Sequence, residues 1–406
     1  MSLRPLKILA FSPGLWGWPE FAGSPRYHLW SLAGRGHRVV YVEPPIMLRA
    51  KAAVWKAADR DFTVFGAPWV PPFAVRKAPP TDTGDWWRRK TSELLWKRTK
   101  KFIDGMKYQP EVLWFGAPWH SHLNRCVREV GAPMRVAHIY DELSLSPALA
   151  EPQREALWSW ERELLRMMDL ALCSSEPQLQ RRYSLARKSM LLENAVADFF
   201  IADKRVSPTK EAVPFIRRMD SIEAPRIVYG GVLDARVNPE VLEMISSSFA
   251  ANLVVAGKID PAYPAHSLQK LKANPAVHFL GSVPYSAFPH LYDRAEVLLL
   301  AHHRSPFTDG MYPEKMNEYL ASGKPVVATR IPEAGRIARD IGRDGAVLLA
   351  ETPAQFSAML QRALKEAPGG PLAAARQKYA RTHTWSATAE RLDRELHMQL
   401  DHRPIF

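Results

Sequence analysis

The stretch YPEKMNEYLASGKPVVATRIPE, residues 312–333, reads as a short helix followed by a strand. Pro313 suits the first helical position because its missing N–H would be unpaired there anyway, and Gly323 can end the helix because glycine adopts a left-handed backbone cheaply. These two residues predict a helix over 313–322. The apolar run PVVAT that follows is typical of a strand buried on both faces.

A second apolar run, AEVLLLAHH at 295–303, precedes this helix. Strand, helix and strand in this order predict a βαβ unit, in which ligands bind beyond the carboxyl ends of the strands. The loop 304–312 and Lys315, in the first helical turn, fall at that edge. A lysine beside the partly positive end of a helix predicts an anion-binding site.

This helix also has two faces, because successive side chains are about 100° apart. Met316, Tyr319 and Leu320 fall on one face, and Glu314 and Glu318 fall on the other. The pattern therefore predicts that the two glutamates point away from the core.

The whole chain has 406 residues, of which 47% are hydrophobic and 24% are charged, as in ordinary soluble globular proteins. That length exceeds what one hydrophobic core supports, so two domains are expected. Predicted strands alternate with helices in both halves, which indicates α/β layering. The strands are expected at 6–12, 37–45, 111–116, 135–140, 169–175, 189–194, 226–234, 252–257, 277–283, 295–303 and 325–329.

The stretch 201–225 has no consistent period and is the predicted linker. We therefore expect an N-terminal domain over 1–200, a second domain over 226–385 and a C-terminal helix within 386–406. Further helices are expected at 25–36, near 119–130, and at 150–168, 351–366 and 370–381.

The apolar segments are short, and none approaches about eighteen uninterrupted residues. The first residues lead into a strand without a signal-peptide pattern, so a cytoplasmic protein is expected. Cys126 and Cys173 are the two cysteines, too few for a disulfide framework or a cysteine metal site. Both are expected to be buried thiols.

The net charge is +13, and the segment 86–107, WWRRKTSELLWKRTKKFIDGMK, holds eight of the Lys and Arg residues. Its apolar residues recur at helical spacing, which predicts a basic amphipathic helix. Two interpretations stay open: docking on an anionic membrane surface, or a packed helix with a solvated charged face. Nucleic acid is not an expected partner, because no nucleic-acid-binding motif accompanies the charge.

Five phrases of the sequence follow one another in a familiar order: SPRYHLWSLAGRGHRVVYVEPP, AHIYDELSLS, LLENAVADFF, GSVPYSAFPHLYDRAEVLLLAHH and PEKMNEYLASGKPVVAT. Together they resemble GT-B glycosyltransferases of the family 4, group 1 type, most of all the bacterial enzymes that build surface polysaccharides. The resemblance covers nearly the whole chain. It implies two Rossmann-like domains facing a cleft, the first for the acceptor and the second for the nucleotide sugar, with a C-terminal helix that crosses back to the first domain.

The resemblance implies roles for two residues of the opening helix. Glu318 matches the family glutamate that holds the ribose diol of the donor, and Lys315 matches the lysine that meets the donor diphosphate. A carboxylate accepting two hydroxyl hydrogens suits a ribose. The alternatives are a solvent-facing glutamate and an i,i+3 ion pair between the two side chains.

One position departs from the family pattern. Where retaining members carry a second glutamate, this chain has Gly310, with Asp309 beside it. Either Asp309 contacts the donor sugar or the glutamate role is absent, so retention and inversion of configuration both stay open.

The segment YGGVLDAR offers further donor-binding candidates. Gly230 and Gly231 let backbone N–H groups approach a phosphate or sugar, and Arg236 can reach the same place. The base of the nucleotide is expected along 281–285, which includes Val283.

On the acceptor side, Asp141 and Glu142 follow a predicted strand that contains His138. If the reaction inverts configuration, a carboxylate takes the proton of the acceptor hydroxyl, and Asp141 is the best-placed candidate. An acidic helix N-cap is an equally supported interpretation. An Asp141→Asn variant that binds donor but does not turn over would support the base.

Three histidines, His290, His302 and His303, raise the question of a metal site. They lack a third ligand at usable spacing, so no metal is expected. The leaving diphosphate would instead be stabilised by cations and helix ends, which requires no cofactor beyond the nucleotide sugar itself.

The sequence thus predicts a glycosyltransferase that moves a sugar from a nucleotide-diphosphate-sugar to a glycan or lipid-linked acceptor, in the cytoplasm or on the inner face of the plasma membrane. Two alternatives stay open. A nucleotide-sugar epimerase shares the architecture, and a non-catalytic partner would hold another transferase at the membrane.

Overall fold

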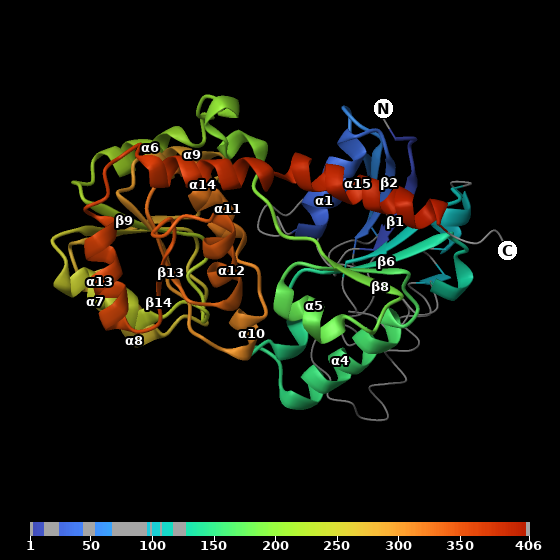
Figure 1. Cartoon of the computed structure of the whole chain (residues 1–406), viewed down its shortest axis with the longest axis horizontal. Helices are drawn as coiled ribbons and strands as arrows, with labels where there is room; N and C mark the ends of the chain where they lie inside the picture. Colours follow the sequence, from blue (N-terminus) through green and yellow to red (C-terminus); the bar gives the residue numbers. More distant parts are fainter. Residues whose placement is uncertain are drawn as a thin grey trace. The chain divides into compact units, whose positions relative to one another are not determined.

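The computed structural model describes residues 3–11, 24–43, 53–66, 96–97, 100–105, 108–116 and 127–402. The chain forms two compact units, Met1–Glu193 with Thr388–Phe406 and Asn194–Ala387. Each unit has its own sheet with helices packed against it (Figure 1), which confirms the predicted α/β class. Cys126 and most of the predicted basic helix at 86–107 lie outside the described residues.

Unit 1 is built on an eight-stranded sheet of order β3-β4-β2-β1-β5-β6-β7-β8. All neighbouring strands are parallel except β3 and β4, which form an antiparallel pair at the edge. That pair was not predicted from the sequence. The strands are β1 (Lys7–Phe11), β2 (Arg38–Glu43), β3 (Ala53–Lys56), β4 (Phe62–Gly66), β5 (Val112–Phe115), β6 (Met134–Ile139), β7 (Leu170–Cys173) and β8 (Lys188–Leu191).

The described helices of unit 1 cover both faces of this sheet, because the buried strands are apolar on both sides. Leu9 of β1 belongs to the cluster that contains Leu164, whereas Ile8 belongs to the cluster that contains Leu392 and Leu396. The predicted return of the C-terminal helix to the first domain is thereby confirmed. The helices are α1 (Ser24–Gly34), η3 (Leu143–Leu145), α4 (Glu151–Leu165), α5 (Glu176–Arg182) and α15 (Trp385–Asp401).

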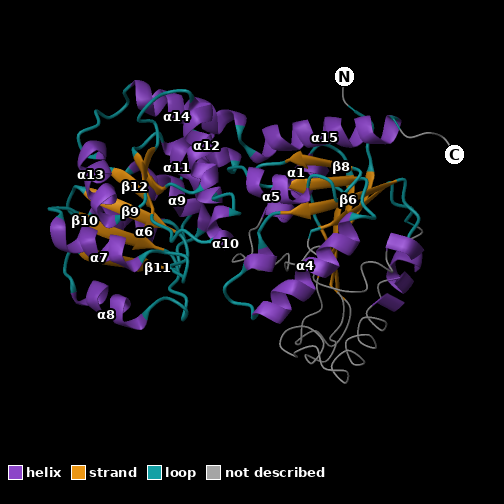
Figure 2. Ribbon diagram, turned by 60° about the horizontal axis from the view of Figure 1, so that its bottom comes forward, coloured by secondary structure: helices purple, strands orange, loops and turns teal. Residues whose placement is uncertain are grey.

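Unit 2 is built on a six-stranded, entirely parallel sheet of order β11-β10-β9-β12-β13-β14. Within this unit, helices lie on both sides of the strands (Figure 2). The strands are β9 (Arg226–Gly230), β10 (Asn252–Ala256), β11 (Val277–Gly281), β12 (Val297–Leu300), β13 (Val326–Thr329) and β14 (Leu348–Ala350).

The helices of unit 2 follow the βα order that the sequence predicts. The stretch 201–225, which we expected as a linker, lies inside this unit and contains a helix of its own. The helices are η4 (Asp198–Phe200), η5 (Ala202–Lys204), α6 (Val213–Asp220), α7 (Pro239–Ser248), α8 (Ala265–Ala273), η6 (Tyr285–Ala287), α9 (Phe288–Asp293), α10 (Pro306–Asp309), α11 (Glu314–Ser322), α12 (Pro332–Ile341), α13 (Pro353–Ala363) and α14 (Pro371–Thr382).

Helix α11 is the helix predicted from the opening stretch. Gly323 ends it with φ +75°, in the left-handed region that favours glycine. Six consecutive residues of the helix, 316–321, are buried, because α9 and α14 contact it in addition to the sheet side. None of the described helices is both long enough and apolar enough to cross a bilayer.

Candidate active site

The turn after β9 is shaped by two glycines. The Gly230 N–H donates to the Tyr319 hydroxyl at 3.0 Å, and the Gly231 N–H donates to the Ala256 carbonyl at 2.7 Å. Gly231 has φ +121°, and a Cβ there would lie 2.0 Å from Cε of Lys315. The absence of a side chain at Gly231 therefore gives the lysine its place against the backbone.

Lys315, in the first turn of α11, is the central charge of this region. Its Nζ lies 5.3 Å from the centre of the Tyr229 ring. Burial, followed by the nearby Arg236 cation, lowers the pKa of Lys315 to about 8, although Asp234 and Glu318 act in the opposite direction. The lysine is thus held where an incoming anion would strengthen its positive charge.

Arg236 sits in the loop after β9 and forms a two-pronged ion pair with Asp234. Its Nε and Nη2 lie 3.0 and 2.6 Å from the two carboxylate oxygens. Burial favours the neutral acid, but the hydrogen bonds and charge of Arg236 outweigh it and lower the pKa of Asp234. Asp234 was not among the residues predicted from the sequence, and it fixes where the guanidinium can point.

Glu318 is buried, with 6% of its surface exposed. The Tyr292 hydroxyl donates to Glu318 Oε2 at 3.1 Å. Burial raises the pKa of Glu318, while Tyr285, Lys315 and Tyr292 favour its charged form. The prediction that Glu318 points away from the core was wrong, because tyrosines of η6 and α9 cover the face of α11 that lies opposite Met316.

The remaining donor-side candidates lie on neighbouring loops. Asp309 is engaged by Arg304, whose Nε and Nη2 lie 2.6 and 2.9 Å from its carboxylate oxygens. Gly310 is buried and ends the short helix α10. Val283 is half-buried between β11 and η6. The structure therefore groups Gly230, Gly231, Arg236, Lys315 and Glu318, and ties Asp309 to a surface arginine.

The acidic segment after β6 in unit 1 divides into two different environments. Glu142 is buried and paired with Arg181 and Arg182, with Arg182 Nη1 2.7 Å from its Oε2. Asp141 is half-buried and is not the N-cap of η3; Glu142 occupies that position without a side-chain capping bond. Burial lowers the pKa of His138 to about 3. Glu142 is thus structural, whereas Asp141 stays a candidate.

His290, His302 and His303 are the histidines that raise the question of a metal site. Among the described ranges, no group of three or more His, Cys, Asp or Glu side chains could hold a metal ion. The adjacent His302 and His303 lie in different environments, since His302 is buried and His303 is exposed.

Solved structures of other proteins have a similar fold. The sucrose-phosphate synthase of Thermosynechococcus elongatus is 14% identical, with a TM-score of 0.73 over 98% of this chain and 100% of that chain. A structure from E. coli, trehalose-6-phosphate bound with UDP-2-fluoro glucose, is 11% identical, with a TM-score of 0.67 over 96% and 98% of the two chains. These likenesses show the predicted GT-B fold.

Part of the sequence is similar to a known family. Residues 231–366, which carry the Gly231 turn, Lys315 and Glu318, match the family of glycosyl transferases group 1. This part of the chain is a group 1 glycosyltransferase domain. TuaH of Bacillus subtilis (strain 168), named as a glycosyltransferase of teichuronic acid biosynthesis, is 21% identical over 319 residues, which are 75% of each chain. The chain is therefore a glycosyltransferase, as predicted, and nothing favours the epimerase or the non-catalytic partner.

Three residues near the proposed donor site of this glycosyltransferase were not expected there from the sequence. Tyr292 belongs to α9, Asp234 precedes Arg236 by two residues, and His302 was weighed only as a metal ligand, whereas Tyr285 of η6 ends the stretch 281–285 that was expected to hold the base. The spacing of Asp234 and Arg236 was the one local signal in the sequence, since it allows an ion pair within the loop. The tyrosines meet Glu318 only through the fold and left no such signal.

Proposed function

We propose that this glycosyltransferase moves a sugar from a nucleotide-diphosphate-sugar to a glycan or lipid-linked acceptor during synthesis of a surface polysaccharide. The observation that carries the proposal is Lys315, held against Gly231 at the start of α11. A partly buried lysine and a helix N-terminus together suit an anion at the carboxyl edge of a parallel sheet, whereas the Gly230 and Gly231 N–H groups are already bonded to Tyr319 and Ala256. The name of TuaH and the UDP-sugar in the E. coli structure support the same class of reaction.

In this proposal each donor group has its own partner. Glu318 binds the ribose hydroxyls in place of the Tyr292 hydroxyl that it now accepts from. The diphosphate lies between the Gly231 backbone, Lys315 and Arg236, and the base lies along 281–285 beside Val283. Because negative charge grows on the departing diphosphate, Lys315 stabilises the transition state more than the ground state. No cofactor is required for this chemistry.

The acceptor hydroxyl must lose a proton in the same reaction. If configuration is inverted, Asp141 takes that proton as general base. If configuration is retained, no such base is needed. Asp309 is a further proposed contact to the donor sugar, which it reaches only by exchanging Arg304, because that arginine holds both of its oxygens.

The experiment that tests the proposal is thermal unfolding with UDP, GDP, TDP, ADP and CMP and the matching sugar nucleotides. A ligand at a hundred times its dissociation constant stabilises a protein by about 2.7 kcal/mol, which is readily measured. We expect one nucleotide to raise the Tm and its sugar nucleotide to do the same. If no nucleotide in the panel raises the Tm, the proposed function is wrong.

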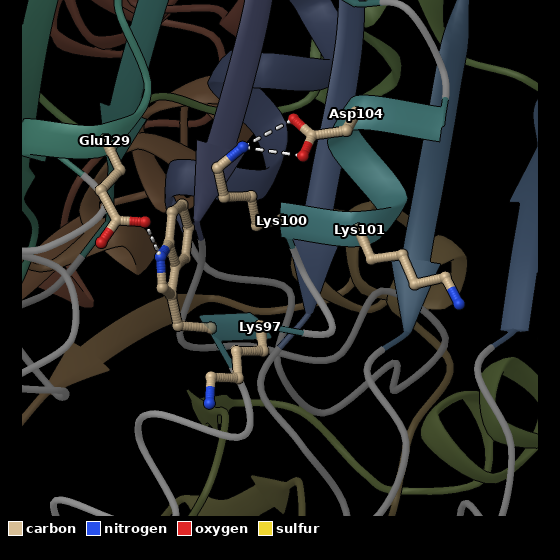
Figure 3. Close-up of a pocket in the computed structure, with 6 residues that line it drawn as sticks. Lys97, Lys100, Lys101, Asp104 and Glu129 are labelled. Carbon is tan, nitrogen blue, oxygen red and sulfur yellow. Dashed lines mark hydrogen bonds and ion pairs between the residues drawn. The ribbon is translucent and has the colours of Figure 1, made fainter.

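The basic segment 86–107 is proposed to dock the enzyme on the cytoplasmic face of an anionic membrane. Of this segment, residues 96–97 and 100–105 are described. A cavity of 370 Å³ is lined by Trp96, Lys97, Lys100, Lys101, Asp104 and Glu129. The Trp96 indole N–H donates to Glu129 Oε2 at 2.5 Å. In Figure 3 Lys100 reaches Asp104, and the Lys97 and Lys101 side chains extend away from that pair. The exposed Lys97 and Lys101 suit a phospholipid surface, where each cation contributes about 1 kcal/mol, whereas Trp96 is buried inside the protein.

Reversing two of these charges tests the docking. In a Lys97→Glu, Lys101→Glu variant, binding to vesicles rich in phosphatidylserine should weaken by about tenfold or more, because two charges change sign and the net charge of the surface falls by about four units. Sedimentation with vesicles measures this. The matched control, Lys272→Glu with Lys365→Glu, changes the net charge equally at two exposed lysines of unit 2. Equal loss in both variants would mean that net charge alone is sensed and that 86–107 is not the docking surface.

A further inference from the structure

His302 is fixed by its backbone at the carboxyl end of β12. Its N–H lies 2.8 Å from Oγ1 of Thr329, and its carbonyl oxygen lies 2.8 Å from the same hydroxyl. On the other side, His302 pairs with Val237 in an antiparallel bridge, and the next residue's N–H donates to the Arg236 carbonyl at 2.7 Å. The imidazole is therefore carried on a rigid support beside the loop that holds Arg236.

Within the described part of the chain, one ring nitrogen of His302 lacks a hydrogen-bond partner. The residue is 4% exposed, and its Nδ1 has no hydrogen-bond partner among the described residues. Buried polar atoms in proteins are almost always paired, and an orphan at a candidate site calls for a specific explanation. An atom of a bound ligand would supply the missing partner.

The charges around His302 indicate what kind of ligand atom this is. Burial lowers the pKa of His302 well below its ordinary value, and the neighbouring Lys315 and Arg236 cations lower it further, against the opposing effect of Asp234. The imidazole is thus neutral at physiological pH and keeps one N–H to donate. A neutral donor beside two cations suits an oxygen of a phosphate, which accepts hydrogen bonds only.

We propose that Nδ1 of His302 donates a hydrogen bond to the diphosphate of the bound donor, next to Lys315 and Arg236. This assignment rests on the proposed function, because it assumes that a nucleoside diphosphate occupies the site. It adds a neutral hydrogen bond with a fixed direction to a site otherwise served by the two cations. His302 therefore sets the position of the diphosphate, while Lys315 supplies charge.

The two ring nitrogens can be separated by substitution. In His302→Asn the side-chain amide nitrogen lies near the place of Nδ1, whereas in His302→Gln it lies nearer that of Nε2. His302→Leu has neither nitrogen. The control is His303→Leu, the same change on the adjacent, exposed histidine.

Calorimetry with the nucleoside diphosphate that stabilises the wild type measures the effect. We expect affinity to fall by about tenfold in His302→Leu and in His302→Gln, and to stay within about threefold in His302→Asn and His303→Leu. For the matching unphosphorylated nucleoside, all four variants should resemble the wild type. Unchanged diphosphate affinity in His302→Leu would overturn the assignment.

Thermal unfolding without ligand distinguishes a binding role from a structural one. Because leucine removes an unpaired buried polar atom, the unliganded His302→Leu protein should unfold at the same temperature as the wild type or above it. A variant that binds less tightly and is also less stable would instead indicate that His302 only supports the fold. If the wild type binds no nucleoside diphosphate, the proposed function itself is refuted. If the wild type binds it and His302→Leu binds it equally well, only the role of His302 is refuted.

Discussion

Replacing Lys315 with methionine should slow release of nucleoside diphosphate from the donor by about a hundredfold to a thousandfold. The lysine is the cation that lies against the Gly231 backbone, and loss of one positioned donor to a developing negative charge commonly has an effect of this size. Turnover with the donor found by thermal unfolding measures it. Lys324→Met, just beyond the other end of the same helix, is the control and should leave turnover nearly unchanged.

The same lysine predicts a pH dependence with a definite sign. Since the pKa of Lys315 is about 8, the unliganded lysine is charged below that pH and loses its proton above it. Affinity for a nucleoside diphosphate should therefore be constant near pH 7 and fall above pH 8, by up to about tenfold per unit. In Lys315→Arg, which stays charged throughout, this fall should disappear. An unchanged fall in the arginine variant would assign the titration to another group.

Glu318→Gln should remove the enzyme's preference for a ribose. We expect the affinity for the ribonucleotide to fall by about tenfold to a hundredfold, which corresponds to the loss of charge-assisted hydrogen bonds. The 2′,3′-dideoxy analogue has no diol, so it should bind wild type and variant equally. Calorimetry with both nucleotides gives the comparison.

Glu314 provides a matched control for this experiment, because it lies one turn earlier on α11 and is half-buried. Glu314→Gln makes the same chemical change and should alter neither affinity. If the dideoxy analogue loses as much affinity as the ribonucleotide in Glu318→Gln, the glutamate does not contact the ribose and acts through the shape of the pocket.

The fold around the site could be predicted largely from local patterns. The helix predicted over 313–322 from Pro313 and Gly323 differs from α11 by one residue at its start. The apolar runs on either side are β12 and β13. The antiparallel pair β3 and β4 escaped prediction. Its strands are short, and β3 forms the edge of the sheet beside β4, where pairing depends on the neighbouring strand more than on sequence period.

The environment of the site residues could not be predicted in the same way. A helical period assigns Glu318 to the face opposite Leu320, but it cannot tell that tyrosines from other elements cover this face as well. Tyr292 meets Glu318 across twenty-six positions of sequence, and Gly230 meets Tyr319 across eighty-nine. Residue types at the site were therefore predictable, whereas their partners depend on the fold.

Helix α15 has a consequence for the order in which the protein folds. Unit 2 is one continuous stretch, 194–387, whereas unit 1 combines 1–193 with the segment from 388 onward, whose Leu392 and Leu396 are fully buried in its core. As the chain leaves the ribosome, unit 2 can finish folding while unit 1 still lacks part of its interior. We expect the nascent first half to expose apolar strands until α15 is made, which makes it the part most dependent on chaperones.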